Sequence, residues 1–350
     1  MKTRIIGRKW VQAWFDERQC NHMPSLTLGY DGTLLAAWYG GMIAWNGDPM
    51  GRDATVWLSR LERGAEAWSN PEGVGTDMRY CCHDSCFVKN AQGDILLVYS
   101  KWLDTAGNVS TWCNGRDKLW MTKSKDGGMT WLPAKETNIP LIGIPSNDGI
   151  LLPNGDMLMA VTSTEDPDFY FGAVRILRST DDGETWEMES LLKVDDGTKI
   201  REPVLVLRPD GSIHIYTRIC PANLGWGGPG IEQTIYAYTC RSFDNGKTWT
   251  KPGPSTITNN ESKIDVINWT DGSLLMAYDY TTNLDWHERS PLWLARSTDD
   301  GATWENIIQL EPGPGVKAQP AMCVDTDGRL NVVYMHRHTA VEHIVVEMSY

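Results

Sequence analysis

Histidine and arginine side chains at selected positions give this sequence its clearest capacity for chemistry. His22 precedes Gly32 by ten residues, and His83 precedes Gly93 by the same interval. Two histidines at one repeated position suit general acid and base catalysis, or ligation of a divalent ion, because imidazole changes its charge near neutral pH. A hydrogen-bonded structural role fits the same residues, and the sequence leaves both interpretations open.

Three arginines, Arg201, Arg218 and Arg289, are candidates for binding a carboxylate. The planar guanidinium group meets two carboxylate oxygens at once, which the ammonium group of lysine does not. A salt bridge between neighbouring parts of the fold is the other interpretation, above all for Arg201, because Glu202 follows it directly. The arginines therefore predict either an acidic ligand or internal ion pairs.

The elements that must position these residues are marked by a repeated motif, Ser-x-Asp-x-Gly-x-Thr-Trp. Its four copies occupy residues 124–131, 179–186, 242–249 and 297–304. The closing tryptophans are 55, 63 and 55 residues apart, which is the length of one small antiparallel sheet. Asp and Gly turn the chain between strands while the hydroxyls satisfy turn amides, so we interpret the motif as structural rather than catalytic.

Glycines in polar turns form a second repeat, and the number of these turns gives the number of sheets. The turns are separated by 61, 62, 56, 61 and 56 residues and lie at Gly32, Gly93, Gly155, Gly211, Gly272 and Gly328. The sequence therefore predicts an all-β fold, a six-bladed β-propeller with four-stranded antiparallel blades, as one domain over residues 1–350. An N-terminal strand over residues 5–14 should complete the last blade and remove an open edge.

Propeller geometry then selects the residues that face the central channel. Positions just before the inner strands should line the channel mouth, and they include His22, His83, Arg201, Glu202 and Gln319. Loops after the second strands should surround the same mouth, and they add Tyr39, Trp102, Arg218 and Arg289. An exposed tryptophan there suits the faces of sugars. Packing or surface roles are expected for the histidines in or near the last strand, which are His336, His338 and His343.

The repeated motif, the six turns and three further stretches resemble the sialidase (neuraminidase) superfamily over nearly the whole chain. The further stretches are residues 34–41, 54–60 and 291–297, and the likeness is greatest to the bacterial BNR, or Asp-box, sialidase-like branch. The resemblance implies that the Asp-box turns lie on the outer rim, away from the axis where ligands bind. It also implies three arginines that bind a carboxylate, a tyrosine nucleophile activated by a glutamate, and an aspartate as acid and base.

Compared residue by residue, the resemblance is incomplete. Glu202 occupies the position of the activating glutamate, and Arg218 and Arg289 lie in loops similar to those of the second and third arginines. His22 stands where the first arginine would be, and Gln319 stands where the tyrosine would be. The resemblance therefore implies that part of the carboxylate site is retained while the usual nucleophile is absent.

The function predicted on this basis is a sialidase-like exo-glycoside hydrolase that removes a terminal, acidic sugar from a glycan or oligosaccharide. In the family the acid comes from the loop of the first blade, where Asp48 and Asp53 are both candidates. A lyase acting on uronic acids is the first alternative, with His22, His83 or Tyr39 removing the C5 proton. A non-catalytic glycan-binding propeller is the second alternative.

Composition limits the partners and the setting of the protein. The formal net charge of -13 disfavours nucleic acid and anionic membranes, which both require a basic surface. Residues 1–10 carry charge where a secretory signal has an apolar run, so we expect a cytoplasmic protein. Residues 81–86 hold three cysteines and a histidine without paired metal-site spacing, and we expect neither a metal nor another cofactor. The oligomeric state stays open.

Overall fold

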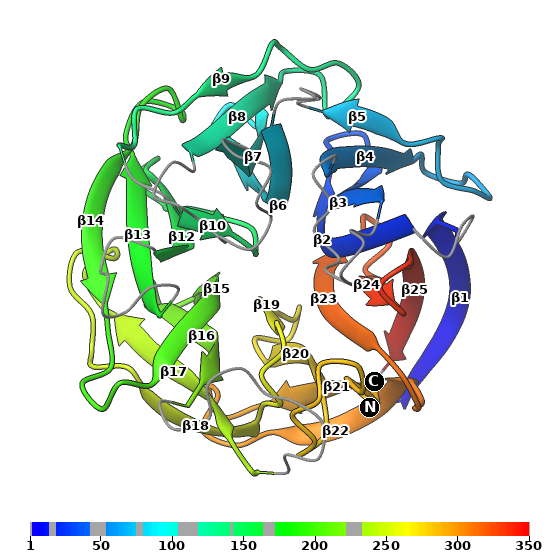
Figure 1. Cartoon of the computed structure of the whole chain (residues 1–350), viewed down its shortest axis with the longest axis vertical. Coiled ribbons are helices and arrows are strands. Elements are labelled where there is room, and N and C mark those ends of the chain that lie inside the picture. Colours follow the sequence, from blue (N-terminus) through cyan, green and yellow to red (C-terminus); the bar gives the residue numbers. More distant parts are fainter. Residues whose placement is uncertain are drawn as a thin grey trace.

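The computed structural model describes residues 2–13, 19–42, 54–74, 80–103, 118–140, 143–163, 172–221 and 233–349. Within these residues the chain forms six antiparallel sheets that surround a central axis as the blades of a propeller (Figure 1). The predicted six-bladed all-β fold is confirmed. In this part of the chain, no helix has the length and apolar character needed to cross a membrane.

Each blade runs from an inner strand at the axis to an outer strand at the rim (Figure 1). Blade 1 consists of β2 (Gln19–Leu28), β3 (Leu34–Met42), β4 (Thr55–Leu61) and β5 (Glu72–Val74). Blade 2 consists of β6 (Tyr80–Lys89), β7 (Ile95–Leu103), β8 (Lys118–Ser124) and β9 (Lys135–Glu136). Blade 3 has an inner strand in two pieces and consists of β10 (Gly143–Pro145), β11 (Ile150–Leu151), β12 (Met157–Ser163), β13 (Ala173–Ser179) and β14 (Glu187–Leu192).

The second half of the ring follows the same plan. Blade 4 consists of β15 (Lys199–Leu207), β16 (Ile213–Cys220), β17 (Tyr236–Ser242) and β18 (Gly253–Thr258). Blade 5 consists of β19 (Asp265–Asn268), β20 (Leu274–Asp279), β21 (Leu292–Ser297) and β22 (Glu305–Glu311). Blade 6 consists of β23 (Lys317–Val324), β24 (Leu330–His336), β25 (Ala340–Ser349) and β1 (Lys2–Gln12).

The first strand of the chain closes the ring by pairing with the last. β1 runs antiparallel to β25, from Lys2 opposite Ser349 to Gln12 opposite Val341. The predicted N-terminal strand is thus confirmed, although it begins and ends earlier than residues 5–14. One sheet therefore contains both ends of the described chain, and Figure 1 shows the two termini side by side.

Each Asp-box turn joins the third strand of a blade to its outer strand and is held by hydrogen bonds within itself. In the first copy, Asp126 Oδ1 accepts hydrogen bonds from the Thr130 amide at 2.9 Å and from the Ser124 hydroxyl at 2.8 Å. Ser124 Oγ in turn accepts from the Gly128 amide at 2.8 Å. The other three copies repeat this pattern. These turns lie on the rim, as predicted.

Hydrophobic clusters fill the seams between adjacent blades, and tryptophans complete several of them. Trp186, which is 1% exposed, belongs to the cluster between blades 2 and 3. Trp249 and Trp304 pack against the clusters on either side of blade 4. Blade 1 has lost the aspartate of its box but keeps Trp68 in its seam with blade 6. Because packed seams fix each blade against the next, residues from different blades keep defined relative positions at the axis.

Candidate active site

Backbone bulges shape the channel mouth at the start of four inner strands. Met23, Asp84, Glu202 and Gln319 have φ angles of 51°, 34°, 47° and 59°, which lie in the left-handed region. The pairing between inner and second strand shifts at each of these positions. A bulge re-aims the side chains beside it, and the strained residue costs on the order of 1 kcal/mol. Such strain gathers at functional sites, so the backbone itself marks the mouth as a candidate site.

Blades 4 and 5 contribute a buried group of charged residues that we call the arginine cluster. Arg218 Nη1 donates a hydrogen bond to Glu202 Oε1 at 2.7 Å, and Arg218 Nη2 donates to Glu261 Oε1 at 3.5 Å. Arg201 Nη2 lies 3.6 Å from the same Glu261 oxygen. Arg289 Nη2 donates to the backbone carbonyl of Glu261 at 2.7 Å. The three predicted arginines and Glu202 therefore meet around Glu261, which sequence reasoning missed.

In the arginine cluster three guanidinium groups face the carboxylates of Glu202 and Glu261. The carboxyl group of Asp279 also lies near Arg289, but its pKa is raised to about 7, so it offsets the third guanidinium only partly at neutral pH. Among the described residues, Arg218 Nε, Arg289 Nε and Glu202 Oε2 are buried and find no hydrogen-bond partner. Burial, and then the charge of Arg218, lowers the pKa of Arg289 to about 10. Burial raises the pKa of Glu202, but the charge and hydrogen bond of Arg218 outweigh it and leave this pKa below its ordinary value. An added carboxylate would satisfy unpartnered donors and balance the charge.

Blades 1, 2 and 6 contribute a group of rings to the mouth that we call the imidazole wall. His22 and Tyr39 are paired across β2 and β3, and Tyr39 Oη lies 3.0 Å from His22 Nδ1. The His22 ring stacks on His338, with centroids 5.4 Å apart and planes inclined by 10°. His83 meets the Tyr39 ring edge to face at 4.9 Å. The structure therefore brings both predicted mouth histidines together with Tyr39, and it adds His338.

The imidazoles of the wall are neutral at neutral pH. Burial lowers the pKa of His83 to about 3, and burial followed by Arg289 lowers the pKa of His338 to about 3. Burial, then His338, and then Arg289 and Arg218 hold the pKa of His22 well below its ordinary value. A neutral imidazole has one nitrogen that donates and one that accepts. The wall therefore supplies proton acceptors without adding positive charge.

Asp279 is a further residue of the mouth that sequence reasoning missed. It ends β20, is 0% exposed and lies near Arg289. Burial raises the pKa of Asp279 to about 7, while the Ser262 hydroxyl and Arg289 act in the opposite direction. Asp279 follows the glycine of its turn by seven residues, as Tyr39 and Arg218 follow theirs. That shared interval is the signal in the sequence that identifies it.

The remaining predicted residues divide into those that the structure places and those that it does not describe. Gln319 is 2% exposed, and its Oε1 accepts a hydrogen bond from the Met23 amide at 3.1 Å, which ties blade 6 to blade 1. Asp48 and Asp53 lie outside the described residues, as does the side chain of Trp102, whose backbone belongs to β7. The described residues contain no group of three or more His, Cys, Asp or Glu side chains arranged to hold a metal ion.

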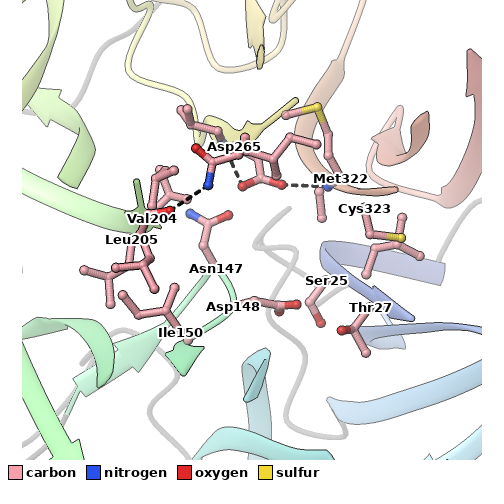
Figure 2. A pocket seen from close by; sticks show the side chains of 18 of the residues that line it. Ser25, Thr27, Asn147, Asp148, Ile150, Val204, Leu205, Asp265, Met322 and Cys323 are labelled. Carbon is pink, nitrogen blue, oxygen red and sulfur yellow. Dashed lines mark hydrogen bonds between the residues drawn. The ribbon is translucent and has the colours of Figure 1, made fainter. Parts of the chain in front are cut away.

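A cavity of about 480 Å³ lies between the inner strands of the blades (Figure 2). Its lining residues follow the mouth residues along these strands, toward the glycine turns. Backbone amides hold its carboxylates: Asp265 Oδ2 accepts from Met322 at 2.6 Å, and Asp148 Oδ1 accepts from Phe87 at 2.9 Å. Burial raises the pKa of Asp148 to about 7. The lining of the cavity, as the structure describes it, includes none of the arginines or histidines of the mouth. We therefore place the candidate active site at the mouth.

Comparison with known proteins adds independent information on this chain. A family model described as a BNR repeat-like domain matches residues 32–332. A xyloglucanase of Paenibacillus sp is 28% identical over an alignment of 251 residues, and the alignment covers 63% of this chain. The chain spans only 22% of the length of that relative, so the likeness concerns one part of a longer protein.

Solved structures share the architecture of the chain. A protein of unknown function from Dyadobacter fermentans superposes with a TM-score of 0.79 at 17% identity, over 99% of both chains. The Hadza microbial sialidase Hz136 superposes with a TM-score of 0.74 at 18% identity, over 96% of this chain and 67% of that one. At such identities the likeness establishes a shared fold, and the chemistry must be argued from the residues of the mouth.

Proposed function

This chain belongs to the family of BNR repeat-like domains, and on that premise we propose that it is a glycoside hydrolase acting on a terminal acidic sugar of a glycan or oligosaccharide. The arginine cluster carries the proposal, because its surplus guanidinium group and its unpartnered Nε donors call for an anionic ligand. A sugar carboxylate has the two oxygens that a guanidinium group binds best. The hydrolase names of the sialidase and the xyloglucanase support the same reaction class.

Each group of the mouth has a role in this proposal. Arg218 and Arg289 bind the sugar carboxylate, and their buried setting strengthens the charge interaction. An acid protonates the leaving oxygen, and Asp48 and Asp53 are its candidates. A base activates the attacking water, and His22 and Glu202 are its candidates. The carboxylate site thereby orients the sugar relative to both groups.

Turnover of the methylumbelliferyl glycosides of N-acetylneuraminic acid and of glucuronic acid tests the proposal. We expect the wild-type protein to hydrolyse at least one of them, and Arg218→Ala to lower kcat/KM by about a hundredfold or more. Arg296→Ala is the matched control, because Arg296 pairs with Asp271 at the glycine turn of blade 5. We expect this control to retain wild-type activity. Absence of turnover in the wild-type protein, or an equal loss in both variants, contradicts the proposal.

A lyase acting on uronic acids is the second candidate function, and the contact between His22 and Tyr39 favours it. In a β-elimination an arginine neutralises the sugar carboxylate while a base removes the C5 proton, and a neutral histidine beside a tyrosine suits that step. The unsaturated product absorbs ultraviolet light, whereas the product of hydrolysis does not. Binding of a glycan without any product would indicate a non-catalytic propeller instead.

A further inference from the structure

The two candidate bases of the mouth differ in how free they are to accept a proton. Glu202 Oε1 accepts a hydrogen bond from Arg218 at 2.7 Å, and its backbone amide donates to Thr162 Oγ1 at 2.8 Å. The bulge at Glu202 and both of these bonds fix its carboxylate against the arginine. A carboxylate paired in this way is a weak base, because protonation would break a charge-assisted hydrogen bond. Glu202 therefore serves as the counter-charge of Arg218.

His22 is held in the opposite manner, because the contacts found among the described residues fix its ring through Nδ1 and one face, and none of them involves Nε2. Tyr39 Oη lies 3.0 Å from Nδ1, and the face of the ring stacks on His338. Tyr39 is 3% exposed and His83 is 1% exposed, whereas His22 is only partly buried. In the tautomer whose Nδ1–H donates a hydrogen bond to Tyr39 Oη, the lone pair is on Nε2, at the other edge of the ring.

We propose that His22 is the catalytic base of this mouth, with Nε2 as the acceptor, and that Tyr39 and His338 are positioning residues that fix its ring and tautomer. The inference rests on the proposed hydrolase function and decides between its two candidate bases. It follows the general pattern of a base within hydrogen-bond reach of a third group that orients it. The nearby Arg218 and Arg289 hold the acidic sugar. In the free protein, burial, then His338, and then the charges of these two arginines keep the pKa of His22 well below its ordinary value, and the carboxylate of the bound sugar offsets the arginine charges.

The step is a single displacement by water. The water oxygen forms a bond to the anomeric carbon while the bond from that carbon to the leaving oxygen breaks. The proton of the water passes to His22 Nε2, and the leaving oxygen takes a proton from the acid, for which Asp48 and Asp53 are the candidates. Solvent then removes the proton from His22 and returns one to the acid, so that the protein regains its starting state.

This assignment fixes the stereochemical outcome of the reaction. Water that attacks directly approaches the face opposite the leaving group, so the configuration of the anomeric carbon inverts. A covalent intermediate on a protein side chain would give retention instead. Proton magnetic resonance of the first-formed sugar reports the anomer before the two forms equilibrate, and we expect the inverted one.

The variants His22→Gln, Tyr39→Phe and Glu202→Gln, assayed on the methylumbelliferyl glycoside that the wild-type protein hydrolyses, test the assignment. We expect His22→Gln to lower kcat by about 100-fold to 10000-fold with KM changed by less than about threefold, because the carboxylate site is intact. Tyr39→Phe keeps the ring but loses the hydroxyl, and we expect kcat to fall by about tenfold at constant KM. We expect Glu202→Gln to act mainly on KM, since it releases the partner of Arg218.

Each outcome of this experiment decides the assignment. A product of retained configuration, or a kcat of His22→Gln within about threefold of the wild-type value, overturns the role of His22 but leaves the hydrolase proposal in place. Absence of hydrolysis by the wild-type protein overturns both proposals. Thermal unfolding of every variant and the activity of Arg296→Ala serve as controls for folding. If His22→Gln does not fold, a loss of kcat at constant KM in Tyr39→Phe together with inversion supports the assignment, and an unchanged kcat overturns it.

Discussion

Polar groups at the rim of this propeller and polar groups at its channel mouth find their hydrogen-bond partners in opposite ways. In an Asp-box the carboxylate of Asp126 finds its donors within four residues of sequence, and the turn is complete in itself. At the mouth, Arg218 and Arg289 reach partners from other parts of the chain and still leave buried Nε groups without partners. Groups whose hydrogen bonds are made within one turn recur from blade to blade, whereas the groups of the mouth vary between blades, with the shared position of His22 and His83 as an exception. The repeated residues therefore identify the scaffold, and the positions where the repeat is not kept identify the candidate site.

The largest effect expected from this contrast lies in the seams that the rim motif supports. Trp186 is 1% exposed and fills the seam between blades 2 and 3. Replacing it with alanine should lower the free energy of unfolding by about 3–5 kcal/mol, the usual cost of a large aromatic cavity. Urea unfolding followed by fluorescence measures this loss.

The same Trp186→Ala variant should keep the wild-type kcat/KM at temperatures where it is folded, because the seam cluster, as the structure describes it, includes none of the mouth residues. Trp10→Ala is a matched control on an exposed tryptophan, since Trp10 is 48% exposed on β1. Equal stability of the two variants would contradict a structural division between rim and mouth. So would a loss of activity in folded Trp186→Ala.

A replacement at the mouth should have an effect of intermediate size on the free energy of unfolding, and it should raise this free energy rather than lower it. Burial raises the pKa of Asp279 to about 7. A carboxyl group whose pKa is higher in the folded state stabilises the fold below its ordinary pKa, and this stability is lost as pH rises through about 7. Asp279→Asn should therefore raise the free energy of unfolding at pH about 8 by about 1 kcal/mol or more, while at pH about 4 it changes little.

Melting temperatures of wild-type protein and Asp279→Asn across that pH range test this expectation. A stabilising replacement is characteristic of functional sites, where residues are retained at the expense of stability. Curves that stay parallel from acid to alkaline pH would show that Asp279 does not titrate on unfolding. A variant destabilised at every pH would instead assign Asp279 a structural role.

The sequence predicts the fold well because turn chemistry is local. Six glycines such as Gly32 and Gly272 adopt positive φ in their turns, and simple counting from them locates the inner strands. The same counting identifies Tyr39 and Arg218 at the mouth. What the residue types do not reveal is which of these positions are strained, since the bulges at Asp84 and Gln319 depend on pairing between strands.

The site is only partly predictable, because its missing members lie outside the counted positions. Glu261 precedes β19, which begins late, at Asp265, so the count from Gly272 passes over it. His338 lies in the tight turn between β24 and β25, with φ of 60°, and reaches His22 only because blade 6 packs beside blade 1. Contacts of this kind depend on ring closure, which joins parts of the chain more than 300 residues apart.

The smallest expected effect lies in the rim turns themselves. The hydroxyl and amide of Thr248 lower the pKa of Asp244 to about 2, below the ordinary value of 3.8. A carboxylate with a lowered pKa stabilises the fold above its ordinary pKa, and this contribution is lost as pH falls through about 2. Thr248→Val removes the hydroxyl donor but keeps the shape of the side chain. Because Asp244 is exposed and screened by solvent, the variant should melt less than about 2 °C below wild type at pH about 5.

That small difference should shrink further as the pH of the melting experiment is lowered toward about 2, because the carboxylate is then protonated in both proteins. Both replacements lose their effect as pH falls, but the effects have opposite sign: at higher pH Thr248→Val lowers the stability of the fold, whereas Asp279→Asn raises it. Effects of opposite sign at Asp244 and Asp279 would separate a rim that is stabilised by its charges from a mouth that is destabilised by them. If both variants changed the stability in the same direction, the carboxyl group of Asp279 would be accessible to solvent rather than buried. The surplus positive charge of the arginine cluster would then be solvated as well, and it would no longer support binding of an anionic ligand.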